Sequence, residues 1–212
     1  MPEALVTLNE RTIMCPIELF KSTFIFSTLR FGLLDCDGSE KRYTCCISPD
    51  ALPRLTQPKT PILFSLLGQI AVKDCFMTAR GCLRPPDEEP VASCWLEQRS
   101  NPVSDLTWRG ILPTIKALVQ EFAAGSEVDT SQLLAVGADG KLRFQVIWQG
   151  DVGESGGDLP MFDEFGTEQV PASISQVPFG QPVHAVFSID FVHDRQAGKR
   201  TVLASLFALM KA

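Results

Sequence analysis

The segment 183–193 constrains the fold more than any other, because its apolar and polar residues alternate with a period of two. The odd positions from Val183 to Phe191 are apolar, whereas the even positions include His184, Ser188 and Asp190. Such alternation is typical of a strand with one face in a core. Residues 194–200 (DRQAGKR) then predict a turn, and 201–210 predict a returning strand buried on both faces, with a terminal helix as the alternative.

Two further hairpins are predicted upstream of this pair. The segment 23–33 is rich in aromatic and β-branched residues, and 42–47 returns after a turn cluster at 35–40. The second hairpin joins 133–136 to 142–148 through a turn at 138–140. Single strands are predicted at 75–83 and 91–96, so most of the chain reads as sheet-forming.

Helical patterns occur in three places. Apolar residues from Ile111 to Ala123 form one stripe, with Pro113 expected in the first turn and Gly125 as the stop, so the main amphipathic helix is predicted at about 111–124. A buried helix is predicted at 61–71, with a strand as the alternative, and a short capped helix begins at Ser48. We therefore predict an α+β protein with hairpin-rich antiparallel sheets, one main helix and one or two short ones.

The 212 residues are expected to form a single compact domain 1–212 with two lobes. The first lobe is a cysteine-rich segment 1–83, and the second is 105–212, which holds the helix, two hairpins and a long acidic loop 150–182. All seven cysteines lie in the first half, and none are spaced C-x-x-C. We expect reduced, buried thiols, with no metal site and no cofactor.

The charge balance shapes the prediction of partners. The chain has 19 Lys and Arg against 25 Asp and Glu, a net charge of −6, and its basic residues are scattered. On this basis nucleic acid is excluded as the main partner. No apolar run reaches the ~18 residues that span a bilayer, and no secretory signal is visible, so the sequence predicts a cytoplasmic protein without membrane contact.

The acidic loop contains Gly153-Glu154-Ser155-Gly156-Gly157, which satisfies the pattern G-x-S-x-G of a nucleophilic serine. The five residues also look like a segment of trypsin-like serine proteases, although those enzymes place a histidine before the serine and this chain does not. Ser155, together with His184 and Asp190 downstream, is the alternative catalytic set. This set would make the chain a hydrolase. The predicted strand ends seven residues before Ser155, which argues against a nucleophile turn.

Without a coherent catalytic set, we predict a non-enzymatic, cytosolic protein-binding or assembly subunit. Its partner would contact a sheet edge or the loop 150–182, where aromatic and acidic side chains adjoin. The predicted contact residues are Phe162, Asp163, Glu164 and Phe165. A homo-oligomer is possible, and a small-ligand module with a pocket between sheet and helix is the third alternative.

Overall fold

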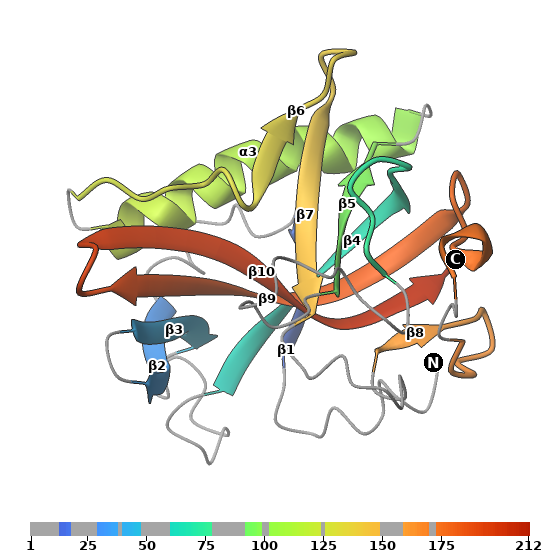
Figure 1. The fold of residues 1–212 in the computed structure, drawn as a ribbon. Coiled ribbons are helices and arrows are strands. Elements are labelled where there is room, and N and C mark those ends of the chain that lie inside the picture. The colour runs from blue at the N-terminus through green and yellow to red at the C-terminus, as the bar shows by residue number, and fades with distance from the viewer. Residues whose placement is uncertain are drawn as a thin grey trace.

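The computed structural model describes residues 13–17, 29–37, 40–47, 60–77, 92–98, 102–123, 126–148, 159–169 and 173–212. Within these ranges the chain forms ten strands, one α-helix and one short 3-10 helix (Figure 1). The strands are β1 (Ile13–Pro16), β2 (Leu29–Asp37), β3 (Glu40–Ile47), β4 (Thr60–Ile70), β5 (Ala92–Glu97), β6 (Leu134–Val136), β7 (Leu142–Trp148), β8 (Met161–Phe162), β9 (Pro182–Asp194) and β10 (Lys199–Lys211). The helices are α3 (Pro102–Ala123) and η3 (Ile174–Gln176).

Five of these strands pair in a closed ring. β4 pairs with β5, β5 with β7, β7 with β10, β10 with β9, and β9 with β4 again. The β7–β10 pair is parallel, and the other four pairs are antiparallel. Because each of the five strands has a partner on both sides, the sheet closes into a barrel.

The strand β9 connects this ring to an outer hairpin. Its first half pairs with β4, from Pro182 to Phe187, and its second half pairs with β3, from Asp190 to Asp194. β2 then pairs with β3, and β1 pairs with β4 in parallel. Figure 1 shows the β2–β3 hairpin beside the far end of the β9–β10 hairpin. The long β9 strand therefore belongs to both the barrel and its extension.

The alternation along β9 separates the barrel interior from its outer face. The odd residues from Val183 to Phe191 belong to the main core cluster. Inside, the ring of Phe187 lies 6.2 Å from that of Phe64 and 4.9 Å from that of Phe144, measured between centroids. The even side chains point to the outer face, where Val186 joins Leu63, Ala208 and Met210 in a smaller apolar cluster. The predicted half-buried strand is thus present, and it lies between two clusters.

The helix α3 covers the barrel with its buried stripe, which includes Trp108, Ile111, Ile115 and Leu118 in the main core cluster. Near one end, Trp108 Nε1 donates a hydrogen bond of 3.0 Å to the Leu67 carbonyl. A Cβ atom on Gly68 would lie 3.1 Å from the Trp108 ring, so glycine is needed for this close approach. At the other end, the Phe122 ring stacks on Phe191 with centroids 4.2 Å apart.

The predicted α+β class is wrong. The described residues are mostly strands of one mixed sheet, with a single α-helix among them. The segment 61–71, predicted as a helix, forms the strand β4 instead. Its apolar side chains pack into both clusters, since Phe64 points into the barrel and Leu63 points out. A strand buried on both faces has no two-residue period, and its run of apolar residues can mimic helical spacing.

The main helix is longer than predicted. It begins at Pro102, so Pro113 lies inside it rather than in its first turn. Proline at a first helical position costs no hydrogen bond, which makes Pro102 a suitable start. The hairpins at 133–148 and 183–210 have the predicted strands. The short helix predicted from Ser48 lies outside the described residues, as does most of the strand predicted at 75–83.

In the described part of the chain, no helix has the length and apolar character needed to cross a membrane.

Replacement of the central ring of the barrel is expected to be costly. Phe187→Ala should lower the free energy of unfolding by about 3–5 kcal/mol, because it leaves a cavity between Phe64 and Phe144. Chemical denaturation measures this loss. Phe207→Ala is the matched control, since Phe207 is 42% exposed, and it should cost about 1 kcal/mol or less. Equal losses in the two variants would contradict the assignment of Phe187 to the barrel interior.

Candidate functional site

The outer face of β5 and β7 carries a half-buried aromatic side chain among polar ones. Along β5, Cys94 and Leu96 point into the core, so the intervening Trp95 points outward. Along β7, Phe144 and Val146 point inward, and Gln145 faces outward beside Trp95, its direct partner in the neighbouring strand. Trp95 and Gln145 are partly buried, so a flat ring and an amide lie side by side at the surface of this face.

An arginine borders this aromatic position. Arg143 and Glu97 are direct partners across β5 and β7, and Arg143 Nη2 lies 2.6 Å from Glu97 Oε1. The Arg143 Nε atom is buried and has no hydrogen-bond partner among the described residues. A Cβ atom on Gly137 would lie 2.9 Å from this Nε, so the backbone of Gly137 supports the guanidinium directly. The ion pair and the close backbone therefore hold the arginine in place, and its buried Nε donor is unused.

A buried polar network continues the outer face onto β9 and β10. The Asp190 carboxylate accepts hydrogen bonds from Ser188 Oγ at 2.9 Å and from Ser205 Oγ at 2.5 Å. Thr44, the partner of Asp190 on β3, has a buried hydroxyl without a partner among the described residues. Ser205 also pairs with Ile147 of β7. The network thus stabilises the contact between β9 and β10 next to the Trp95 face.

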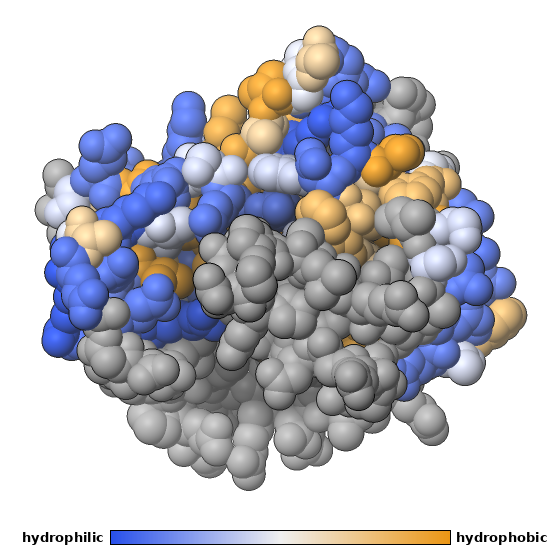
Figure 2. Space-filling model, in the orientation of Figure 1, coloured by the Kyte–Doolittle hydropathy of each residue, from blue (hydrophilic) through white to orange (hydrophobic). Residues whose placement is uncertain are grey.

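Cations gather around the turn that joins β9 to β10. Asp194 Oδ1 accepts hydrogen bonds from the amides of Gln196 and Ala197, and Gly198 has a φ of 63°, which glycine adopts without strain. This tight turn exposes Arg195 and Lys199. Beside it, the cations of the paired strands are Lys41, Arg42 and Arg200. Figure 2 shows hydrophilic residues concentrated over this end of the hairpin, at the left of the view.

Two of these cations have protein partners. Lys199 Nζ lies 2.9 Å from Asp129 Oδ2, and Arg200 Nη1 donates a hydrogen bond of 3.1 Å to the Ala123 carbonyl at the end of α3. The structure gives no ion pair for Lys41, Arg42 or Arg195 within the ranges that it describes. Of these three side chains, Arg195 is exposed, and Lys41 and Arg42 are partly buried.

The predicted contact residues lie at the end of β8 and in the turn that follows it. Asp163 Oδ1 accepts hydrogen bonds from the amides of Phe165 at 2.8 Å and Thr167 at 2.9 Å, and Gly166 has a φ of 81°. Phe162 packs against the smaller apolar cluster, whereas Phe165 is 81% exposed. Glu164 lies 3.9 Å from Lys211. The four residues are adjacent in space, but only Phe165 and Glu164 face outward.

The alternative catalytic residues are not brought together. His184 and Asp190 lie six residues apart on β9, roughly 20 Å at the rise of a strand. Asp190 is 2% exposed and contacts two serines. Ser155 lies outside the described residues. A catalytic set that includes Ser155 therefore stays a prediction.

The cysteines that the structure describes in side-chain detail are buried thiols, namely Cys45, Cys46, Cys75 and Cys94. Burial raises the pKa of the Cys45 and Cys94 thiols well above the usual value, and raises that of Cys75 as well. Such thiols are poor nucleophiles at neutral pH. Within the described ranges no group of three or more His, Cys, Asp and Glu side chains is arranged to hold a metal ion.

No protein-family model matches the chain, and no curated protein matches it in sequence. Among solved structures, the single-stranded DNA-binding protein from bacteriophage Enc34 in complex with ssDNA aligns with a TM-score of 0.50 and 12% identity, over 86% of this chain and 95% of that chain. The single-stranded DNA binding protein gp2.5 encoded by bacteriophage T7 aligns with a TM-score of 0.43 and 17% identity, over 70% and 85%. The chain has the fold of the Enc34 protein.

This likeness corrects the functional prediction. The protein-binding or complex subunit is wrong, and so is the exclusion of nucleic acid, because the solved structure with this fold is a protein in complex with ssDNA. The physical reason is that the net charge of −6 averages over the whole chain, whereas binding depends on local charge and aromatic surface. The candidate residues Trp95 and Arg143 were not among the contact residues predicted from the sequence, although alternation in VASCWLE already separates Trp95 from its buried neighbours.

Asp129, which holds Lys199 beside the basic turn, gives a pH-dependent prediction. Hydrogen bonds from the Ser131 amide and hydroxyl, followed by the Lys199 ammonium, lower the pKa of Asp129 from 3.8 to about 2. The charged carboxylate therefore stabilises the fold above pH 3.8, and this contribution is lost as the pH falls through about 2. Because the side chain is partly solvated, the contribution should be roughly 1 kcal/mol.

Asp129→Asn should thus lower the free energy of unfolding by roughly 1 kcal/mol at pH 6, and the difference from the wild type should shrink toward pH 2–3. Urea denaturation at several pH values measures both quantities. Lys199→Ala should reproduce part of the loss, since it removes one of the groups that lower the pKa. A difference that is constant with pH would rule out this role for Asp129.

Proposed function

We propose that the protein binds single-stranded DNA across the outer face of β5 and β7. The observation that carries this proposal is the closed ring of β4, β5, β7, β9 and β10, in a chain that is similar in fold to the Enc34 protein. A five-stranded barrel of this kind is the OB fold, which binds oligonucleotides on the face of its second and third strands. In chain order these two strands are β5 and β7, the strands that carry Trp95 and Gln145.

The side chains on this face suit unpaired bases. Single-stranded DNA exposes the flat faces of its bases, and an aromatic ring stacks on any of them regardless of sequence. Trp95 supplies such a ring on the outer face. The Gln145 amide beside it has both donors and acceptors for base edges. The guanidinium of Arg143, held by Glu97 and Gly137, adds a planar cation against which a base or sugar can pack.

The DNA backbone requires cations, and these lie at the turn between the fourth and fifth barrel strands. OB-fold proteins use this turn as one wall of their binding groove. Here the turn carries Arg195, and the adjoining β3 carries Lys41 and Arg42. Local positive charge of this kind can neutralise phosphates in a protein that is acidic as a whole. We also propose that the protein acts in the cytoplasm.

The aromatic contact can be tested by replacing one ring. Trp95→Ala should weaken binding of a short fluorescent oligo(dT) by about tenfold to a hundredfold, because one stacked base is worth about 1–3 kcal/mol. Fluorescence anisotropy measures the affinity, and circular dichroism verifies the fold. Val72→Ala is the matched control, an exposed apolar residue that is 73% exposed outside this face. Equal affinity of Trp95→Ala and the wild type would refute the site, and no binding by the wild type would refute the function.

The phosphate contacts can be tested through salt dependence. Each lost contact to single-stranded DNA should reduce the slope of log affinity against log salt by about 0.7. The double variant Arg42→Ala, Arg195→Ala, which removes the β3 cation of the outer face and that of the turn, should therefore bind more weakly at low salt, with a slope smaller by about 1.4. Arg109→Ala, which removes an exposed cation from α3, is the control and should leave the slope unchanged. If both variants show the wild-type slope, the proposed phosphate contacts at β3 and the β9–β10 turn are wrong.

A further inference from the structure

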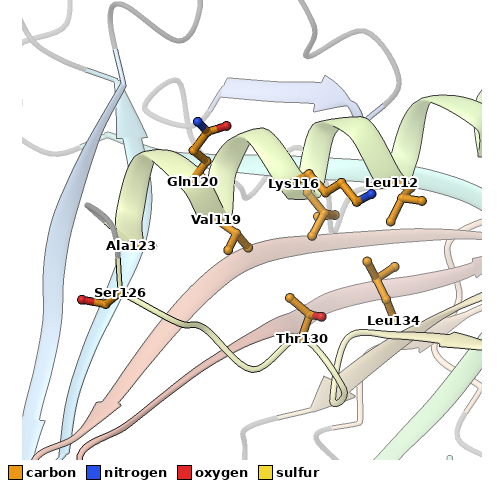
Figure 3. A pocket seen from close by; sticks show the side chains of 9 residues that line it. Leu112, Lys116, Val119, Gln120, Ala123, Ser126, Thr130 and Leu134 are labelled. Carbon is orange, nitrogen blue, oxygen red and sulfur yellow. The ribbon is translucent and has the colours of Figure 1, made fainter.

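An apolar groove between α3 and the segment 126–134 is a poor place for DNA. Its volume is about 350 Å³, and apolar and uncharged side chains make up most of its lining (Figure 3). Lys116 is the one charged side chain among the described residues that line it, and the neighbouring Glu121 and Glu127 are exposed acids. Because such acids repel phosphates, a contact to a base is better sought on the outer face of β5 and β7.

On that face, the ion pair of Glu97 and Arg143 lies next to Trp95 and Gln145. Glu97 is two residues from Trp95 on β5, and Arg143 is two residues from Gln145 on β7, so the four side chains share the outer face. Same-face neighbours along a strand are roughly 6.6–6.8 Å apart, and direct partners on two strands have Cβ atoms roughly 4.5–5.5 Å apart. A base that stacks on Trp95 can therefore place one of its edges over the ion pair.

The Glu97 carboxylate is neutralised by its partner but keeps free acceptor sites. Glu97 Oε1 lies 2.6 Å from Arg143 Nη2, and the side chains of Glu97 and Arg143 are 23% and 26% exposed. The structure gives this carboxylate no second partner within the ranges that it describes. A carboxylate has two oxygens and about four lone-pair sites. The ion pair thus has no net charge to repel phosphates, and its acceptors remain open to groups that bind from solvent.

Arg143 also fixes the position of the carboxylate. Its Nε atom is buried, and a Cβ atom on Gly137 would lie 2.9 Å from this Nε. Arg143 and Glu97 are direct partners in the ladder between β7 and β5, so the backbone sets the separation of the two side chains. Acceptors that are held in place before binding lose little conformational freedom when a ligand arrives.

Guanine is the base whose edge is complementary to this ion pair. Its Watson–Crick edge has two adjacent donors, the N1–H and the N2 amino group, and a carboxylate can accept from both. Adenine, cytosine and thymine have no two adjacent donors on that edge. Beside the carboxylate, the Arg143 guanidinium carries donors of the kind that bind the guanine O6 atom.

We propose that Glu97 recognises guanine, so that the protein binds a single strand more tightly where a guanine stacks on Trp95. This inference rests on the proposed function and adds a preference among bases to it. Contacts to base edges specify sequence, whereas contacts to phosphates and stacking on an aromatic ring accept any base. Glu97 is therefore the specificity-determining residue, and Arg143 positions and neutralises its carboxylate.

The experiment uses short fluorescent oligo(dT) strands that differ at a single central nucleotide. The base at this position is thymine, guanine or hypoxanthine, which is guanine without its N2 amino group. The wild type should bind the guanine strand about tenfold more tightly than the hypoxanthine strand, because the latter lacks one hydrogen bond to a charged acceptor. Fluorescence anisotropy at one salt concentration measures the affinity for each strand.

Glu97→Gln keeps the size of the side chain and replaces one carboxylate oxygen with a donor group. It should reduce the ratio of the guanine to the hypoxanthine affinity from about tenfold to about twofold or less, and circular dichroism verifies its fold. Glu121→Gln, which changes an exposed acid on α3, is the matched control and should keep the wild-type ratio. A purely structural role of the ion pair would change all the affinities alike and leave the ratio as it is.

Equal binding of the guanine and hypoxanthine strands by the wild type would overturn the proposal. This is also the result expected if Arg143 alone contacted O6 and N7, which hypoxanthine retains. A wild-type ratio in Glu97→Gln would overturn it as well. If the wild type binds all the strands equally, the DNA function stands and only the preference for guanine is lost, whereas binding to none of them would refute both.

Discussion

The pairing of β4 with the first half of β9 is the contact on which the other features depend. It joins the first and fourth strands of the barrel, more than a hundred residues apart in sequence, and it turns an open sheet into a ring. Only when this pair forms do Phe64 and Phe187 meet inside the barrel. The cost is the entropy of closing a long loop, which grows slowly with length. Burial of large rings on the inner face opposes that cost.

Closure also creates the outer face. A strand in a barrel has one side in the core, so every second side chain is left for the surface or for an added layer. On β5 and β7 this rule exposes Trp95 and Gln145. On β9 and β10 the same rule places a buried carboxylate and two serines in one network. The outer face of β5 and β7 and the polar network beside it are thus consequences of one geometric constraint.

Local patterns predicted the local elements well and the nonlocal ones badly. The hairpin at 183–210 and the strand near 91–96 follow from alternation and turn residues, which act between neighbours in sequence. The helix predicted at 61–71 failed because β4 is apolar on both sides, and its neighbours β9, β1 and β5 lie far away in sequence. The prediction of the site failed for a related reason. The sequence places Trp95 in a strand, but the importance of its outward position is seen only when the closed ring of five strands is known. The net charge gave a wrong prediction of partners because it does not say where on the surface the charged residues lie.

A β-bulge in β10 affects which strands it can pair with. The register with β9 shifts between Leu206 and Ala208, and Phe207 has no partner there. Because Phe207 is the extra residue, Leu206 and Leu209 both belong to the main cluster, while Ala208 and Met210 belong to the smaller one. Such bulges bend and twist a strand, and here the bend lets β10 leave β7 at Ser205 and meet β8 at Leu209. A chain shorter by this one residue would keep the facing of its side chains and lose the curvature. Deletion of Phe207 should therefore alter the path of β10 from β7 to β8 while its inner and outer side chains stay on their own faces.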